Sequence, residues 1–221
     1  MSLLQVRDLR VEYPGLLLLD GIDMRVDDGE LVAIETGVLD GGTSLLKAIA
    51  GLLRGCGGEV VYRGENLLQG ASEAVAASIG FVYEERGLIS LYTVYQNISL
   101  PLRFHTNLTE AQIEDRITTV CERLGLDASL LTLSPHQLND VQTRLVNLAR
   151  ALVVEPGLLL VDELEGGMSE EVVVATMQTI RSYQAEHPMS VIMTTSSDLV
   201  IERSDRVYDI KNRSLVARGV S

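Results

Sequence analysis

The sequence is poor in several residue types that mark particular classes of protein. Its 221 residues include no tryptophan, two phenylalanines, five prolines and two cysteines. Cys56 and Cys121 have no paired spacing, which excludes a disulfide scaffold or a cysteine-ligated zinc site and is typical of a reduced cytosolic protein. The longest apolar runs, such as 158–161, are far below the ~18–20 residues that a membrane span needs. Because the N-terminus is charged too early for a signal peptide, we expect a soluble protein.

Positive charge is also scarce, and lysine is its scarcest source. Asp and Glu total 31 against 18 Lys and Arg, which gives a formal net charge of −13. Non-specific binding to nucleic acid needs a basic surface, so this balance argues against nucleic acid as a partner. Sixteen of the 18 bases are arginine, and the two lysines are Lys47 and Lys211. A site that needs an ammonium group therefore has only these two to use.

Apolar residues make up 46% of the chain, and their spacing predicts strands that alternate with helices. Such alternation predicts an α/β fold with a mostly parallel sheet covered on both faces, preceded here by antiparallel N-terminal strands. We expect one domain over residues 1–221, with a helical subdomain over about 85–148 inserted in it. The predicted strands are 3–13, 17–26, 31–35, 158–161 and 191–195, and the predicted helices are 45–53, 109–124, 138–152 and 172–185.

Two of these helices carry recognisable start signals. Thr109 can cap the helix 109–124, because Gln112 stands at the capping-box position three residues later. Its apolar face repeats at helical spacing and ends at a glycine. For the helix 138–152, Ser134 is a possible cap.

Six segments, in a fixed order, carry a resemblance to a known family. They are Tyr13, Asp28-Gly29-Glu30, LLKAIAGLL, IGFVYEERGL, LSPHQ and LARALVVEPGLLLVDE; the glycine-rich loop 36–44 directly precedes LLKAIAGLL. In this order the chain resembles, end to end, the nucleotide-binding subunit of an ATP-binding cassette (ABC) transporter. The resemblance implies a P-loop NTPase-like cassette fold. The run TVYQNISLPLRFHTNLTE is most similar to the subunits that power Mce/Mla-type bacterial phospholipid transporters.

The glycine-rich loop departs from the family's phosphate loop, GxxxxGK(S/T), whose backbone N–H groups and lysine face the phosphates. Thr36 stands at the first glycine, Gly42 stands at the lysine, and Asp40 adds a negative charge. Lys47 cannot substitute, because five helical residues turn it by ~140° and move it ~7.5 Å from the helix start. By resemblance, the positions that would bind nucleotide are Tyr13, Gly37, Asp40, Gly41, Gly42, Thr43, Ser44, Ser134 and Gln137.

The positions that the resemblance assigns to catalysis are also only partly retained. Glu163 corresponds to the catalytic glutamate of an active cassette, whereas Ser196 replaces the family's switch histidine. If magnesium binds, its ligands would be Thr43, Glu84 and Asp162, with Glu84 in place of the family's glutamine. In LSPHQ, Pro135 and His136 replace the two glycines of the family signature. The resemblance implies that the N–H groups of those glycines approach the γ-phosphate bound by the partner cassette.

These losses favour a non-catalytic or weakly active cassette subunit of a bacterial membrane transporter, with lipid as the substrate class and with no nucleotide or weakly bound ATP and magnesium. The expected partners are a permease, which would hold the chain at the cytoplasmic membrane, and a second cassette. Two alternatives stay open: an active transport ATPase with unusual site chemistry, and a repurposed soluble binding protein. Some site residues also have structural alternatives, because Asp162 and Glu163 could hold a loop and the glycines could serve a tight turn.

Overall fold

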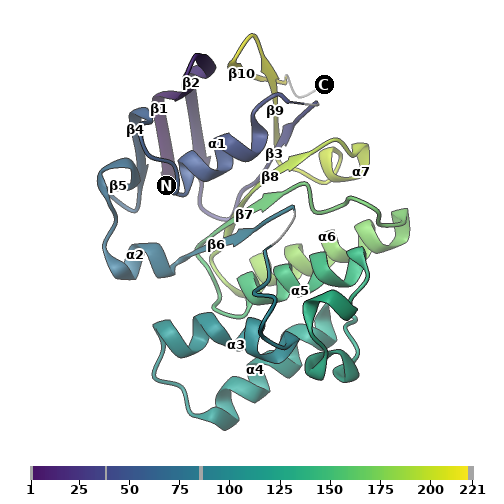
Figure 1. Cartoon of the computed structure of the whole chain (residues 1–221). Coiled ribbons are helices and arrows are strands. Elements are labelled where there is room, and N and C mark those ends of the chain that lie inside the picture. The colour runs from purple at the N-terminus through teal and green to yellow at the C-terminus, as the bar shows by residue number, and fades with distance from the viewer. Residues whose placement is uncertain (1, 38, 85–86, 219–221) are drawn as a thin grey trace.

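The computed structural model describes residues 2–37, 39–84 and 87–218. It contains two β-sheets (Figure 1), one antiparallel with strand order β2-β1-β4-β5 and one with order β10-β9-β3-β8-β7-β6. In the second sheet β9, β3, β8, β7 and β6 are parallel, and β10 pairs antiparallel with β9. The strands are β1 (Ser2–Tyr13), β2 (Leu16–Asp27), β3 (Leu31–Glu35), β4 (Gly57–Tyr62), β5 (Glu65–Asn66), β6 (Ile79–Val82), β7 (Leu158–Asp162), β8 (Ser190–Thr195), β9 (Arg206–Lys211) and β10 (Ser214–Ala217).

The helices divide between the two faces of the larger sheet. In Figure 1, α1 lies between the two sheets, whereas α3, α4, α5 and α6 lie on the other side of the larger sheet. Within the described residues, none of the helices combines the length and the apolar character needed to span a bilayer. The helices are α1 (Gly42–Ile49), α2 (Glu73–Ala77), α3 (Val94–His105), α4 (Glu110–Arg123), α5 (Asp140–Leu152), α6 (Glu170–Glu186) and α7 (Asp198–Ile201), with the 3-10 turns η1 (Leu67–Gln69), η2 (Ala128–Thr132) and η3 (Pro135–Gln137).

Strand β7 shows how one sheet separates two cores. All five of its residues are buried, as expected for a parallel strand with both faces covered. Leu158 and Leu160 belong to the core that contains β1, β2 and α1. Leu159 and Val161 belong to the core that contains α3, α4, α5 and α6. The alternation follows from the two-residue period of a strand, so successive side chains of β7 pack into opposite cores.

The amphipathic helix predicted over 109–124 is confirmed as α4. The Thr109 hydroxyl accepts the Gln112 N–H, and the Gln112 carbonyl oxygen accepts the Thr109 N–H, which completes a capping box. Ile113, Ile117 and Val120 are buried, as their spacing predicts. The helix predicted over 45–53 is displaced, because α1 begins at Gly42 and Gly51, at a φ of +69°, turns the chain away just after its end.

The start of α5 corrects one expectation. Its N-cap is Asn139, whose side chain accepts the Gln142 N–H at 2.8 Å, while Gln142 accepts the Asn139 N–H at 3.0 Å. Ser134 and Gln137 instead close η3, the separate turn before the helix. Two cap patterns of the same spacing follow each other in the sequence, and the one adjacent to the helix caps it. Ser134 is therefore not the cap of α5.

Candidate functional site

The glycine-rich loop lies where three parallel strands end. Strands β3, β7 and β8 finish at Glu35, Asp162 and Thr195, and the loop leads from β3 into α1. In open α/β sheets, ligands bind at the carboxyl ends of the strands. A cavity of about 720 Å³ opens here; it is lined by Tyr13, Leu16, Leu18, Thr36, Gly37, Leu39, Asp40, Gly41, Gly42, Thr43, Ser44, Glu84, Glu163 and Ser196.

The cavity brings together most of the site residues that the sequence predicts. Ten of the thirteen line it, although they come from β1, the loop, the end of β6 and the ends of β7 and β8. Asp162 reaches it through a hydrogen bond from Thr43. Ser134 and Gln137 lie outside it, on η3.

Thr43 and Asp162 form a polar pair at the floor of the site. The Thr43 hydroxyl donates to Asp162 Oδ1 at 3.1 Å, and the Thr194 hydroxyl donates to the same oxygen at 2.9 Å. Among the residues that the structure describes, no three His, Cys, Asp or Glu side chains are grouped so that they could hold a metal ion. Magnesium in nucleotide sites needs only one or two carboxylates, because phosphates and water complete its shell. The pair therefore fits a magnesium ion that arrives with a nucleotide.

Glu163 is surrounded by acidic groups. Burial raises the pKa of its carboxyl, and the charges of Glu84, Asp162 and Glu165 raise it further. The Thr36 hydroxyl, which donates to Glu163 Oε1 at 3.1 Å, opposes this rise in pKa because it stabilises the charged form. A carboxyl with a raised pKa is suited to accept a proton from water. The main chain at Glu163 is held as well, since its backbone N–H donates to Thr194.

Within the glycine-rich loop, a carboxylate of the loop itself occupies a backbone N–H donor. Asp40 Oδ2 accepts the Gly37 N–H at 2.6 Å, so a backbone donor of the loop is already engaged by a carboxylate. Gly41, at a φ of +91°, forms the N-cap of α1 without a side-chain hydrogen bond. Lys47 lies in the last turn of α1 and is not among the residues that line the cavity. The described cavity lining therefore holds no Lys or Arg side chain.

Tyr13 lies at the rim of the cavity. Its hydroxyl and that of Ser44 are 3.2 Å apart, within hydrogen-bond distance, and its side chain is partly exposed at 40%. A half-exposed ring at the end of β1 can present a face to a planar ligand. The contact with Ser44 ties that ring to the start of α1.

Two contacts in the site were not predictable from the sequence. Arg144, on α5, donates from Nη1 to the Glu163 carbonyl oxygen at 2.6 Å. Its guanidinium lies against Gly166, where a built Cβ would be 2.6 Å from Nη2. Glu165 accepts the Ser196 N–H at 3.1 Å and the Thr195 hydroxyl. The only sequence signal was a glycine pair after the acidic end of β7, which does not identify its partner.

Comparisons with known proteins agree with this geometry. The profile of the family described as "ABC transporter" matches residues 19–165. The chain is 34% identical, over 92% of its length, to the sulfate/thiosulfate import ATP-binding protein CysA of Bradyrhizobium diazoefficiens, and 32% identical to that of Rhodopseudomonas palustris. It spans about 60% of the length of these relatives.

Solved structures share the fold. The dimeric structure of MJ0796, titled a bacterial ABC transporter cassette, superposes with a TM-score of 0.91 at 22% identity, covering 98% of this chain and 100% of that one. The structure of cbiO1 from Clostridium perfringens, titled part of the ABC transporter complex cbiONQ, gives a TM-score of 0.80 at 26% identity, covering 97% of this chain and 87% of that one.

The relatives correct the narrower resemblance. Their names specify sulfate/thiosulfate import, and they give no support to a Mce/Mla-type lipid transporter. The family itself is shown by a match to about two thirds of the chain and is consistent with the fold. The chain belongs to the ABC transporter family of ATP-binding cassettes.

Proposed function

We propose that this chain is the ATP-binding cassette subunit of an ABC importer, with a small oxyanion such as sulfate as the substrate class. The observation that carries the proposal is the cavity in which Tyr13, Thr43 and Glu163 meet at the ends of β3, β7 and β8. The names of the relatives favour this active alternative over a non-catalytic lipid-transport subunit. Such a subunit would act at the inner face of the cytoplasmic membrane, held there by a permease.

In this function each retained side chain has a defined task. Thr43 and Asp162 would hold magnesium, which when bound neutralises phosphate charge. Glu163 would orient the attacking water and accept its proton, since its carboxyl lies in the same cavity and its pKa is raised. Tyr13 would offer a surface to the adenine ring. Glu84 lines the cavity and would contact the magnesium or its water.

The same loop predicts weak nucleotide binding. A charge-assisted contact to phosphate contributes about 1.5–3 kcal/mol, and none is supplied at Gly42. The Asp40 carboxylate adds repulsion and engages the Gly37 N–H. We therefore expect ATP affinity to be lower by roughly two to four decades than in a cassette with an intact loop. This loop favours the second candidate function, a non-catalytic subunit of the same transporter.

For the surface that faces a partner cassette, we infer that segment 138–142, rather than the LSPHQ segment 133–137 expected from the sequence, takes the place of the family signature LSGGQ, because 138–142 leads directly into α5 whereas LSPHQ contains the separate turn η3. Asn139 and Gln142 form the capping box of α5, so this segment holds the helix start. In that alignment Asp140 and Val141 replace the signature's two glycines. An exposed carboxylate at Asp140 would repel the partner's γ-phosphate, which would weaken nucleotide-driven dimerisation further.

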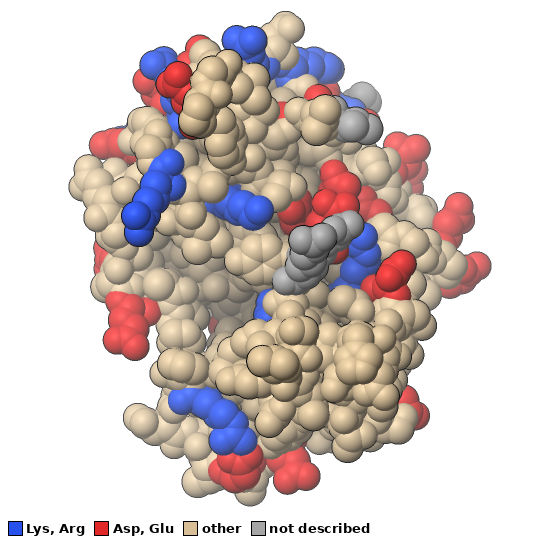
Figure 2. Space-filling view, viewed as in Figure 1, with Lys and Arg blue, Asp and Glu red and all other residues tan. Residues whose placement is uncertain are grey.

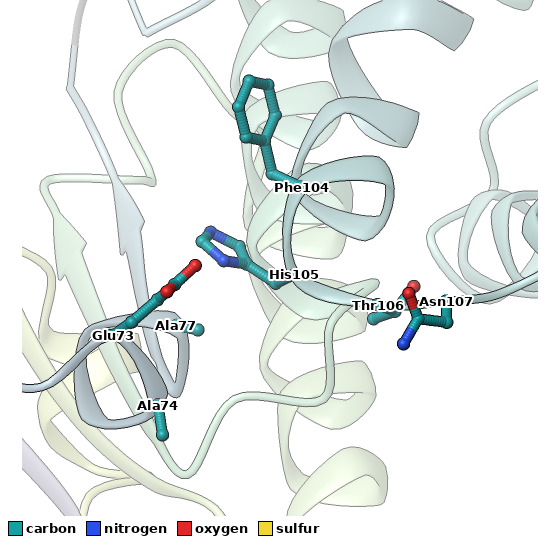
Figure 3. Close-up of a pocket in the computed structure, with 7 residues that line it drawn as sticks. All are labelled: Glu73, Ala74, Ala77, Phe104, His105, Thr106 and Asn107. Atoms are coloured by element: carbon teal, nitrogen blue, oxygen red, sulfur yellow. The ribbon is translucent and has the colours of Figure 1, made fainter.

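The permease is proposed to dock on a hollow beside α3. The hollow contains a pocket of about 500 Å³. In Figure 3 the Glu73 and His105 side chains, which line this pocket, point toward one another. A neighbouring pocket of about 270 Å³ shares Phe104 with it and is lined also by Phe81 and Pro101. Figure 2 shows a wide uncharged surface over the helical end of the molecule.

The test is phosphate release by the complex of this chain with its permease. An active importer subunit should release phosphate with magnesium and ATP, faster when the oxyanion is supplied, and Glu163→Gln should abolish that release. Stimulation by phospholipid instead of sulfate would contradict the substrate class. Equal, background-level release by wild type and Glu163→Gln would favour the non-catalytic candidate.

A further inference from the structure

The loop carries an unusual pair of residues, one with a side chain where the family has none and one without a side chain where the family has lysine. They are Thr36 and Gly42. A Cβ built on Gly42 would lie 2.5 Å from Thr36 Cγ2 and 3.0 Å from Thr194 Cγ2. The first distance is much shorter than non-bonded carbon atoms can approach one another. The Thr36 methyl group therefore occupies the space in which a side chain at position 42 would begin.

The Thr36 side chain cannot easily rotate away. Its hydroxyl donates to Glu163 Oε1 at 3.1 Å and lies 3.5 Å from the Thr195 carbonyl oxygen. Thr36 is also buried, with 7% of its surface exposed. A threonine has few allowed χ1 rotamers, so a rotation that removed the methyl from Gly42 would also break the bond to Glu163.

We propose that Thr36 is a positioning residue that replaces the missing lysine sterically: its methyl closes the space at Gly42, and its hydroxyl holds the Glu163 carboxylate. The two positions form one unit, so a lysine cannot be returned to the loop by a single substitution. The inference rests on the proposed function only where nucleotide is concerned, since the steric exchange is a property of the fold.

A double-mutant cycle on stability tests the exchange without nucleotide. Gly42→Ala adds only a Cβ, and Thr36→Ser removes only the methyl group. We expect Gly42→Ala to lower the Tm by about 3 °C or more in the wild-type background and to be nearly neutral in the Thr36→Ser background. Thr36→Val is the matched control, because it keeps a methyl and loses the hydroxyl; the penalty should persist there. An equal effect of Gly42→Ala in all three backgrounds would overturn the proposal.

A nucleotide arm extends the test to the lysine itself. Binding of ATP with magnesium is measured by calorimetry on Gly42→Lys/Asp40→Ser and on the same variant with Thr36→Ser. The variant with Thr36→Ser should bind at least about tenfold more tightly, since only there can the ammonium reach the loop. Equal binding by both variants would refute the steric role of Thr36. If the stability cycle shows the coupling and neither variant binds ATP, the proposed nucleotide site is wrong while the exchange of Thr36 and Gly42 stands.

Discussion

Glu163 shows how the pKa of a single carboxyl depends on the absence of positive charge around it. Its neighbours Glu84, Asp162 and Glu165 are all acidic, and the lining of its cavity has no Lys or Arg within the described chain. Burial and these surroundings destabilise the charged form of the carboxyl and so raise its pKa. The sequence already showed the shortage of lysine, but the proximity of these four carboxyls depends on the pairing of two strands, β6 and β7, and on the segments that follow them.

This environment predicts a pH-dependent stability for Glu163→Gln. A carboxyl whose folded pKa lies above its unfolded value of 4.5 destabilises the fold once the pH exceeds that value, and the loss is complete above the folded pKa. Glutamine cannot ionise, yet its carbonyl can still accept the bond from Thr36. We expect the variant to raise the Tm by roughly 1–3 °C at pH 7 and to leave it unchanged below about pH 4. Thermal unfolding over this pH range measures it, and a lower Tm at pH 7 would contradict it.

At the scale of elements, three helices at the helical end of the molecule begin with the same type of N-terminal cap. Helices α3, α4 and α5 each begin with a capping box, closed by Gln three residues after the cap. The caps satisfy backbone N–H groups that the first turn leaves free. For α4 the sequence predicted the cap, because only one capping-box pattern precedes its apolar residues. For α5 two such patterns follow each other, one at Ser134 and one at Asn139, and the sequence did not show which of them caps the helix.

The cap of α4 gives a prediction that separates the hydroxyl from the rest of the side chain. Thr109→Ala removes the acceptor of the Gln112 N–H and should lower the free energy of unfolding by about 1 kcal/mol. Thr109→Ser keeps the acceptor and is the control, with a loss under about 0.5 kcal/mol. Denaturant unfolding of both variants provides the measurement. Equal losses would show that the cap bond contributes nothing.

The contact of α5 with the end of β7 predicts a second effect at this scale. In Gly166→Ala the new Cβ would push the Arg144 guanidinium from the Glu163 carbonyl oxygen. We expect a loss of about 1.5–3 kcal/mol in the free energy of unfolding, the range for a hydrogen bond to a charged group. In an Arg144→Ala background the same change should cost much less, because the obstructing group is gone. Additive losses in the double variant would exclude the contact as the cause.

For the whole molecule, the relevant feature is the uneven surface. Phe104 is 74% exposed and borders both pockets beside α3, while the chain as a whole carries a formal charge of −13. A strongly negative net charge favours solubility. An exposed aromatic side chain beside a hollow on such a surface indicates a site of interaction with another protein. The hollow is formed by α2 and β6 from one part of the chain and α3 and α5 from another.

Phe104→Glu tests whether this hollow binds the permease. The side chain contributes little to the core, so the Tm of the isolated chain should change by less than about 1 °C. Recovery of the permease with the tagged chain should fall about tenfold or more, since a charge would enter an apolar contact. Val216→Glu, at a 46% exposed position on β10, is the matched control and should leave recovery unchanged. Undiminished recovery with Phe104→Glu would place the permease elsewhere.

The sequence by itself determined the alternation of strands and helices, the buried strand β7, the amphipathic α4 and the lysine deficit, because these depend on local spacing and composition. The tertiary structure alone decided that Asn139 rather than Ser134 caps α5, that Arg144 contacts the Glu163 carbonyl, and that the Thr36 methyl closes the space at Gly42. These depend on distances between segments far apart in the chain, or on which of two equivalent local patterns the packing selects. No spacing within one segment encodes such distances.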